Sequence, residues 1–441
     1  MRFIFGITDR RFGKVEPMRI LILVDCYYPS KKSGARLVHD LAVELFRQGH
    51  DVLVVTPSAE NKDDLELSSE DGPTVAQIKT GRIKGVPRIL RAIREAKLSA
   101  DLWNKAEKLF RQRPCDLIIF YSPTIFFGAL VKKLKSLWRC PSYLILRDIF
   151  PQWAVDTGML KKGLVYAFFR AKELEQYAAA DIIGVQSPAN LEYFARSLPH
   201  YDRRLEVLYN WMTLNDAGPP PSNYRARLGL QNKVVFFYGG NIGVAQDMNN
   251  IVRLAWNLRS REHIHFLLVG EGSEVGRLEE LIAQKRLSNL SLLPAVSQQE
   301  YLAMLSEFDV GIFSLDRRLR TQNFPGKILG YMYFSMPIFG SVNPGNDLKD
   351  LLETSGAGLC ALNGDDETLR NHALALADDD YLRRSMGKNA RRLLEEKFSV
   401  AAIARQILAH FQHPLPVMKN ESSVGTGSHP THKWQVQGIK V

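Results

Sequence analysis

Cysteine and long apolar runs are scarce in this chain. Its 441 residues hold only 4 cysteines, without a C-x-x-C spacing or a histidine at a metal-ligand spacing, which excludes a disulfide framework and a zinc site as the basis of the fold. No stretch of roughly 18 apolar residues occurs. The nearest candidate, "LIIFYSPTIFFGALV", is broken by Ser122 and Pro123. The first residues, "MRFIFGITDRRFGK", carry too many charges for a secretory signal. We expect a cytoplasmic protein whose membrane contact, if any, is peripheral and on the inner face of the cytoplasmic membrane.

Several enzyme signatures are also missing. The chain has no G-x-x-x-x-G-K-[ST] sequence, no G-x-G-x-x-G after its first apolar strand and no G-x-S-x-G sequence. These absences argue against a P-loop kinase, a dinucleotide oxidoreductase and an α/β-hydrolase. No D-x-D pair stands at a strand end, so we expect no metal site, and no cofactor other than a nucleotide-containing substrate.

The charge balance is basic. A net charge of +11 favours an acidic partner, which can be a nucleic acid, an anionic membrane or a phosphorylated substrate. No known nucleic-acid-binding module or aromatic stacking motif accompanies this charge. A nucleic-acid-binding protein is therefore an alternative that rests on charge alone, and we expect no nucleic-acid partner.

A repeating pattern of strands and helices predicts the fold. "RILILVD", "RLVHDLAVELFRQG" and "HDVLVVTP" have the patterns of an apolar strand, an amphipathic helix and a second apolar strand, which is typical of a buried parallel sheet. The pattern continues to "ADIIGVQSP", breaks at the prolines 219–221 and restarts at "KVVFFYGGN". The sequence thus predicts an α/β protein with two doubly wound, Rossmann-like domains that face each other across a cleft.

The predicted domain boundaries follow this pattern. We expect an N-terminal extension over residues 1–17, a first domain over 18–208, a second domain over 209–395, a helix over 396–413 that packs back on the first domain, and a disordered tail over 414–441.

Ligands of open parallel sheets lie at the carboxyl ends of the strands, so the loops there contain the candidate site. In the second domain these loops are "GGNIG", "GEG" and "RTQNFPGK". Their glycines would let the backbone approach a diphosphate closely. The residues that we predict to bind a donor substrate are Gly34, Asn241, Gly243, Glu271, Gly272, Arg320, Gln322, Pro325 and Gly326.

Lys327 and Asp148 are the candidate catalytic residues. Lys327 stands where a loop becomes a helix, and a helix start with a nearby cation can bind an anion. The alternative is a solvated lysine after an ordinary Pro-Gly loop. Asp148 follows a first-domain strand, where it can orient a hydroxyl group; its alternatives are a helix cap or a pair with Arg147.

The stretches "SGARLVHDLAVELFRQGHDVLVVTP", "FYGGNIGVAQDMNNIV" and "LLVGEGSEVGRLEELI" carry a family resemblance. From about Met18 to about Phe411 the sequence resembles the retaining glycosyltransferases of the GT-B fold, in glycosyltransferase family 4. "RDIFPQWAVDTGML" and "PGKILGYMYFSMPI" are most similar to bacterial O-antigen enzymes that transfer an N-acetylated 6-deoxyhexosamine, such as N-acetyl-L-fucosamine, from a UDP-sugar.

The resemblance implies a UDP-sugar donor on the second domain, a lipid-linked saccharide or glycan acceptor on the first domain, and a role in O-antigen, lipopolysaccharide or other surface polysaccharide biosynthesis. It also implies metal-independent catalysis in which the donor phosphate assists deprotonation of the acceptor. A UDP-sugar epimerase of the same fold is the alternative enzyme.

The sequence departs from the family in its charged residues. The family usually has two glutamates eight positions apart, and the equivalent positions here are Gln322 and Gly330. The cations that many relatives have around "GNIG" are also absent. We expect Lys327 to replace them, together with Arg317, Arg318 and Arg320.

Three further predictions concern basic residues. The segment "GRIKGVPRILRAIREAKLSA" places Arg88, Arg91 and Arg94 on a predicted helix, which can lie on an anionic membrane or be an ordinary surface helix. For His39, within a helix, and His50, in a turn, we predict structural roles.

Overall fold

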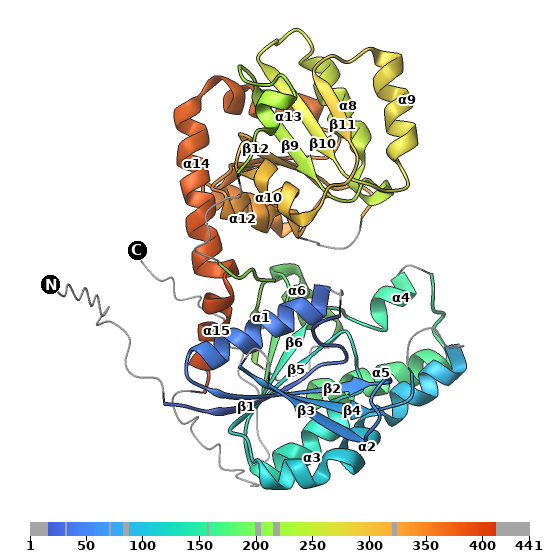
Figure 1. The fold of residues 1–441 in the computed structure, drawn as a ribbon. Helices are drawn as coiled ribbons and strands as arrows, with labels where there is room; N and C mark the ends of the chain where they lie inside the picture. The colour runs from blue at the N-terminus through green and yellow to red at the C-terminus, as the bar shows by residue number, and fades with distance from the viewer. Residues whose placement is uncertain are drawn as a thin grey trace, which may run out of the picture.

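The computed structural model has two α/β domains, one above the other in Figure 1. It describes residues 16–30, 33–69, 72–82, 88–156, 158–198, 204–214, 221–319 and 324–411. The predicted tail, and the predicted N-terminal extension except for its last two residues, lie outside these ranges.

The first domain is built on an eight-stranded sheet with the order β3-β4-β2-β1-β5-β6-β7-β8. All neighbouring strands pair in parallel except β3 and β4, which are antiparallel. The strands are β1 (Arg19–Leu23), β2 (Asp51–Ser58), β3 (Leu65–Ser68), β4 (Thr74–Lys79), β5 (Leu117–Tyr121), β6 (Ser142–Leu146), β7 (Ile182–Val185) and β8 (Arg204–Val207).

Helices cover both faces of this sheet, which is why central strands such as β5 are apolar and buried over their whole length. One face packs on α1 and on a helix from the end of the chain, and the other face packs on α2, α3 and α5. The helices of this domain are α1 (Ser33–Arg47), α2 (Arg88–Gln112), α3 (Gly128–Trp138), α4 (Gln152–Asp156), α5 (Leu164–Ala179) and α6 (Pro188–Ser197).

The second domain has a six-stranded parallel sheet with the order β11-β10-β9-β12-β13-β14. Its strands are β9 (Val234–Gly239), β10 (Ile264–Val269), β11 (Leu290–Leu293), β12 (Val310–Ser314), β13 (Ile338–Val342) and β14 (Gly358–Leu362). Its helices are α7 (Tyr224–Arg227), the 3-10 turn η1 (Val244–Gln246), α8 (Met248–Asn257), α9 (Val275–Lys285), α10 (Gln298–Leu305), α11 (Lys327–Tyr333), α12 (Asp347–Thr354), α13 (Asp366–Asp378) and α14 (Asp380–Leu393).

The predicted fold of two doubly wound domains is confirmed. Four strands, β3, β4, β8 and β14, were not predicted; β8 has the sequence RLEV, with two charged residues and no continuous apolar run. β3 is a short edge strand with two exposed residues, and β4 alternates buried and half-buried positions, so neither has the continuous apolar run of a central strand. β14 is an edge strand of the second sheet and lies next to β13.

The end of the chain crosses back to the first domain, as predicted. After α14, a π-helical turn, η2 (Leu394–Phe398), leads into α15 (Val400–Ala409), which lies beside α1 in Figure 1. Ile403 and Ile407 are fully buried in the first-domain core. The crossing chain is bound to the interdomain connection, because Met212 N donates to Phe398 O at 2.8 Å and Val400 N donates to Met212 O at 3.0 Å.

The carboxyl-end loops of the two sheets contact each other. Ala189, which follows β7, donates its N–H to Asp347 Oδ2 at 2.8 Å, and Asp347 follows β13. Tyr209, which follows β8, stacks on Phe324 with 5.5 Å between ring centroids. The two loop clusters that the sequence predicts to hold a ligand therefore face each other.

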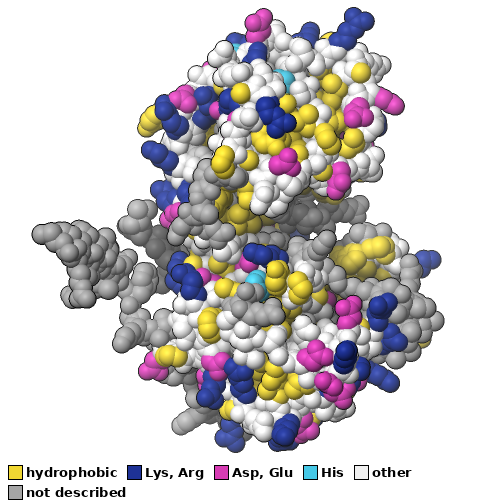
Figure 2. Space-filling model, in the orientation of Figure 1, with side chains coloured by type: hydrophobic (Ala, Val, Ile, Leu, Met, Phe, Trp, Pro, Cys, Tyr) yellow, Lys and Arg dark blue, Asp and Glu magenta, His cyan; other side chains and the backbone are white. Residues whose placement is uncertain are grey.

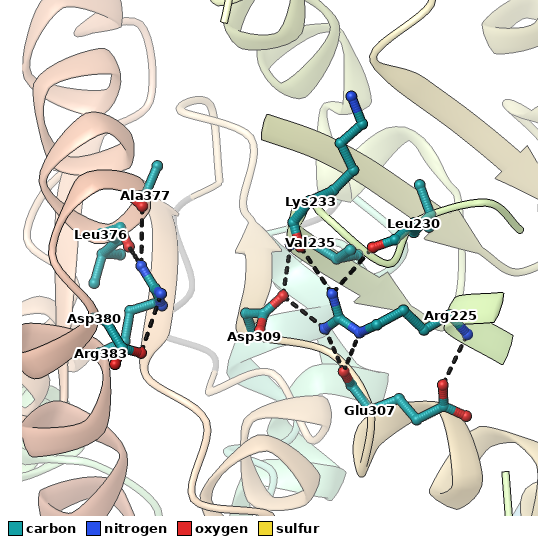
Figure 3. Close-up of polar contacts among 10 residues, drawn as sticks. All are labelled: Arg225, Leu230, Lys233, Val235, Glu307, Asp309, Leu376, Ala377, Asp380 and Arg383. Carbon is teal, nitrogen blue, oxygen red and sulfur yellow. Dashed lines mark hydrogen bonds and ion pairs between the residues drawn. The ribbon is translucent and has the colours of Figure 1, made fainter. Parts of the chain in front are cut away.

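Arg225 ties the start of the second domain to its sheet (Figure 3). Its guanidinium group donates to the carbonyl oxygens of Lys233 at 2.8 Å, of Leu230 at 3.2 Å and of Glu307, and it pairs with Asp309 at 2.8 Å. Asp309 also accepts the N–H of Val235, in β9, at 2.8 Å. One planar side chain thus satisfies several carbonyl groups at once, which a lysine would not match.

We predict that Arg225→Ala lowers the free energy of unfolding by about 2 to 4 kcal/mol, because it removes the charged partner of Asp309 and the guanidinium donor of several carbonyl groups. The control is Arg227→Ala, an exposed arginine over the Tyr224 ring at 5.0 Å, for which we expect less than about 1 kcal/mol. Urea unfolding of the purified variants measures both. Equal losses for the two variants would contradict the role given to Arg225.

Candidate functional site

Two glycine-containing loops of the second domain, those after β9 and β10, lie directly against each other. A Cβ atom on Gly270 would lie 1.9 Å from Gly240 O, and one on Gly272, whose φ is +153°, would lie 2.2 Å from Ile242 O. Only glycine permits this conformation and this approach. The sequence predicted that such glycines make room for a diphosphate; in the structure Gly270 and Gly272 make room for the neighbouring loop.

Lys327 lies beside this pair of loops. Its Nζ lies 3.3 Å from the centroid of the Tyr238 ring, and a Cβ on Gly240 would lie 3.6 Å from the same atom. The Tyr238 hydroxyl donates to Asn241 O at 2.5 Å, which holds the ring in place. The ammonium group is therefore positioned against the backbone of the loop after β9.

The surroundings of Lys327 disfavour an isolated charge. No carboxylate of the described residues forms an ion pair with it. Burial lowers the pKa of Lys327 from 10.5 to about 7, while the π face of Tyr238 favours the charged form. Lys327 is half-buried, and a cation that is partly removed from water and has no anionic partner gains from an incoming anion. The predicted anion site at Lys327 thus has a physical basis.

The helix that starts at Lys327 contributes less than predicted. α11 has only 7 residues, so its dipole is small, and its N-cap, Gly326, has no side chain that could cap it. Pro325 and Gly326 line a cavity of about 20 Å³ together with Gln186 and Asn210 from the first-domain side. Their contact with a donor stays a prediction.

The arginines that precede Lys327 are differently placed. The Arg318 guanidinium donates to Asp316 at 2.5 and 3.0 Å, and this pairing lowers the pKa of the Asp316 carboxyl. Arg317 lies beside Gly364. Arg320 and Gln322 lie outside the described residues. Of the described cations in this segment, Lys327 is the one that adjoins the glycine loops.

Four of the other predicted donor residues, Asn241, Gly243, Glu271 and Gly272, lie in these same loops, whereas Gly34 lies in α1 of the first domain. Asn241 Nδ2 donates to Gln246 Oε1 at 2.9 Å, and the same oxygen accepts the Gly243 N–H at 3.1 Å. Asn241, Glu271 and Gly272 are exposed. The structure brings these four predicted residues near the lysine, and their contacts with a ligand stay predictions.

Asp148 shares its edge of the first sheet with two residues that the sequence analysis missed. Asp25 follows β1, Tyr121 ends β5 and Asp148 follows β6, and these strands are neighbours. Burial raises the pKa of Tyr121 to about 12, with Arg147 opposing and both aspartates adding to the shift. A Cβ on Gly34 would lie 3.2 Å from the Tyr121 ring. In the sequence, the positions of Asp25 and Tyr121 at the ends of strands could have indicated that they belong to the candidate site.

Asp148 is exposed, yet partial desolvation raises its pKa, with Arg147 opposing the shift. The alternative of a direct pair with Arg147 does not hold among the described contacts. Arg147 instead donates to Leu208 O at 2.5 Å and Tyr209 O at 3.2 Å, and it lies over the Trp211 ring at 5.1 Å. Asp148 therefore keeps its carboxylate available at the edge of the sheet.

The two histidines have different surroundings. His50 Nδ1 accepts the Met18 N–H at 3.2 Å, and burial lowers the His50 pKa, which fits the predicted structural role. His39 Nδ1 lies 3.1 Å from the Tyr27 hydroxyl, and its ring stacks on Tyr28 with centroids 4.6 Å apart. His39 lines a cavity of about 500 Å³ at the outer edge of the first sheet.

The predicted basic helix is present as the start of α2. Arg94 donates to Arg82 O at 2.5 Å, and the side chains of Arg88 and Arg91 lie outside what the structure describes. No helix within the described ranges is both long and apolar enough to cross a bilayer. Membrane contact through α2 stays a prediction.

None of the four cysteines, all of which lie in the described ranges, forms a disulfide. Burial raises the pKa of Cys115 and Cys140 to about 12, so these two are unreactive. In the described part of the chain, no three histidine, cysteine or acidic side chains are grouped so that they could hold a metal ion.

Two family profiles match the chain, one in each domain. The profile described as "Glycosyl transferase 4-like domain" matches residues 34–211, which contain Asp148, and the one described as "Glycosyl transferases group 1" matches residues 222–393, which contain both glycine loops and Lys327. The chain belongs to the glycosyltransferases of the GT-B fold. The predicted fold class is thereby confirmed for the whole two-domain arrangement.

Individual proteins and solved structures are also similar to this chain. WcaI of Escherichia coli K12, a protein named for glycosyl transfer in colanic acid biosynthesis, is 24% identical over 368 residues, which are 78% of this chain and 88% of WcaI. Anabaena Alr3699/HepE in complex with UDP has a TM-score of 0.61 at 17% identity, covering 89% of this chain and 99% of that one. WaaG, a glycosyltransferase of lipopolysaccharide biosynthesis, has a TM-score of 0.54 at 13% identity over 89% and 99%.

We predict a specific pH dependence of stability from the surroundings of Lys327. The unfolded chain keeps the ordinary pKa of 10.5 while the folded protein has a value of about 7, so the unfolded chain binds more protons between these pH values. The lysine therefore lowers stability at pH 7, and its cost declines as the pH rises toward 10.5, by up to about 1.4 kcal/mol per pH unit. Lys327→Met removes this cost.

The measurement is urea unfolding of the wild type and Lys327→Met between pH 7 and 9.5. The stability advantage of the variant should be greatest at pH 7 and shrink with rising pH. Lys388→Met, at an exposed position, is the matched control and should follow the wild type. Parallel profiles for wild type and Lys327→Met would show that Lys327 is charged and solvated in the folded protein.

Proposed function

We propose that this glycosyltransferase transfers a sugar from a UDP-sugar to a lipid-linked saccharide, with retention of anomeric configuration, in the biosynthesis of O-antigen, lipopolysaccharide or another surface polysaccharide. The observation that carries the proposal is Lys327, a desolvated cation with no carboxylate partner among the described residues, next to the glycine loops of the second domain. The UDP complex of HepE and the names of WcaI and WaaG support the donor and the pathway class.

Lys327 acts on the leaving group in this proposal. Negative charge grows on the diphosphate as the glycosidic bond breaks, and a preorganised cation in a water-poor site stabilises that charge most in the transition state. The diphosphate also supplies the missing anionic partner, so donor binding raises the lysine pKa and keeps the ammonium group charged. The adjacent loop residues Asn241, Gly243, Glu271 and Gly272 contact the donor.

Asp148 acts on the acceptor side. Its exposed carboxylate stands at the carboxyl end of β6 and orients the acceptor hydroxyl, while the donor phosphate assists in removing the hydroxyl proton. Because Lys327 provides the compensating charge, no metal ion and no cofactor are required. The donor sugar is an N-acetylated 6-deoxyhexosamine such as N-acetyl-L-fucosamine, and the reaction takes place at the cytoplasmic face of the membrane.

The direct test is a product assay. The purified protein is incubated with a panel of UDP-sugars and a lipid-diphosphate saccharide, with and without EDTA, and products are identified by mass spectrometry. We expect one added deoxyhexosamine, equally in both conditions. Loss of product in EDTA, restored by Mg²⁺ or Mn²⁺, would overturn metal independence. Interconversion of the UDP-sugar without transfer would identify an epimerase, and transfer of another sugar would correct the donor.

We predict that Lys327→Ala lowers kcat by about tenfold to a thousandfold, on the scale of losing one electrostatic contact to a developing charge. A change in KM alone would instead indicate ground-state binding. Lys327→Arg should recover part of the activity, because it keeps the charge but alters the geometry.

The matched control is Lys285→Ala. Lys285 also lies over an aromatic ring of the second domain, at 4.9 Å from the Trp256 centroid, but it lies at the end of α9, away from the strand-end loops. We expect its kinetics to equal those of the wild type. Steady-state kinetics on protein checked by circular dichroism measure both, and a near-normal kcat for Lys327→Ala would refute the catalytic role.

A further inference from the structure

The first domain exposes a cluster of large apolar side chains on α4, on the start of α5 and on the turn between them. We call it the α4–α5 surface. The exposed fractions of its side chains are 37% for Trp153, 66% for Met159, 92% for Leu164, 59% for Val165 and 41% for Phe168. In Figure 2 hydrophobic side chains gather at the place that α4 occupies in Figure 1. Five large apolar side chains exposed within residues 153–168 indicate an interaction site.

This surface is part of the ordered fold. An aromatic row supports it from within, with Phe150 at 6.0 Å from Trp153 and 5.1 Å from Phe169. Phe168 in turn lies 6.5 Å from the buried Phe126. Backbone bonds close the turn, since Leu160 N donates to Ala154 O at 2.9 Å. Aromatic packing from within thus supports Trp153 and Phe168.

Two lysines in the same turn give the surface its charge. Lys161 and Lys162 stand between Met159 and Leu164 and are exposed, and neither forms an ion pair with another described residue. Apolar side chains that enter the acyl boundary, next to lysines that meet anionic headgroups, form the pattern of an interfacial membrane contact. Trp153 at its edge is of the residue type that prefers this interface.

We propose that the α4–α5 surface docks this protein on an anionic lipid bilayer. The surface is close in sequence to Asp148, the candidate residue on the acceptor side, because Trp153 stands five positions after it. Docking here presents a lipid-linked acceptor to the carboxyl edge of the first sheet; this part rests on the proposed function, whereas docking itself does not. The contact differs from the one predicted at α2, where Arg94 is bound to Arg82 O.

A second copy of the chain fits this surface less well. In a two-fold symmetric dimer the same surface faces itself, so Lys161 and Lys162 of both copies would be brought together around the apolar centre. A bilayer with anionic headgroups has the complementary charge. The proposal therefore commits to lipid, and self-association is an outcome that the test can reveal.

The test is flotation of the full-length protein with vesicles of phosphatidylcholine and phosphatidylglycerol, compared with phosphatidylcholine alone. We expect the double variant Lys161→Ala/Lys162→Ala to bind the anionic vesicles about 30-fold more weakly, about fivefold for each lysine. Leu164→Ser/Phe168→Ser should weaken binding by at least about tenfold through lost apolar insertion. The wild type should bind the neutral vesicles much more weakly than the anionic ones.

A spectroscopic readout locates the contact. Brominated lipids should quench the fluorescence of the wild type, and Trp153→Phe should remove most of that quenching while the vesicle affinity changes little. The control variant Leu362→Ser/Tyr381→Ser alters side chains that are 46% and 79% exposed on the second domain and should bind like the wild type. Circular dichroism confirms that each variant is folded.

Three outcomes would overturn the docking proposal. Wild-type protein that does not float with anionic vesicles, or variants that bind unchanged, would show that this surface does not dock. If binding is lost only on charge reversal of Arg88, Arg91 and Arg94, the contact belongs to α2. If Leu164→Ser/Phe168→Ser converts a dimer to a monomer in light scattering and vesicles are not bound, the surface is a subunit interface. Failure of the sugar-transfer assay with intact docking would refute the proposed function alone.

Discussion

The arrangement of the two half-sites depends on the guanidinium group of Arg147. This side chain is held within the first domain, where it donates to the carbonyl oxygens of Leu208 and Tyr209. Desolvation lowers its pKa, but its charge is retained because an arginine does not deprotonate in proteins. These hydrogen bonds fix the start of the connection between the domains. Tyr209, in this connection, stacks on Phe324, which stands shortly before Lys327 in the sequence. The residue next to Asp148 therefore also determines where the second domain begins.

Charge in the second domain is mostly neutralised locally. Arg225, Arg253 and Arg318 are each bound to an aspartate of the same domain. These pairs serve the fold and leave little charge for a ligand. Lys327 differs because its neighbours are an aromatic ring and a glycine backbone. The basic net charge therefore does not indicate where a ligand binds. Lys327 does, because it adjoins the glycine loops and has no carboxylate partner among the described residues.

Much of the fold could be predicted from the sequence, because continuous apolar strands alternate with amphipathic helices on both sides of a proline-rich break. The edge strands β3, β8 and β14 were not predicted; β3 (LELS) and β8 (RLEV) contain charged residues and lack a continuous apolar run. For the candidate site, the sequence indicated which loops stand at the strand ends, but it did not show which side chains and loops contact each other. The bond of Arg318 to Asp316, the approach of the two loops at Gly270 and the position of Tyr121 next to Gly34 all depend on side-chain and backbone packing in three dimensions.

The return of α15 to the first domain has a consequence for synthesis of the chain. Ile403, Ile407 and Leu408 complete the apolar face that α1 and β1 begin, so the first domain lacks part of its core until the end of the described chain has left the ribosome. At about 5 to 20 residues per second, translation of the intervening second domain takes about 10 to 40 s. During that interval the nascent first domain exposes an apolar groove. The second domain, whose described core residues all precede α15, can therefore complete its folding first, although it is made later.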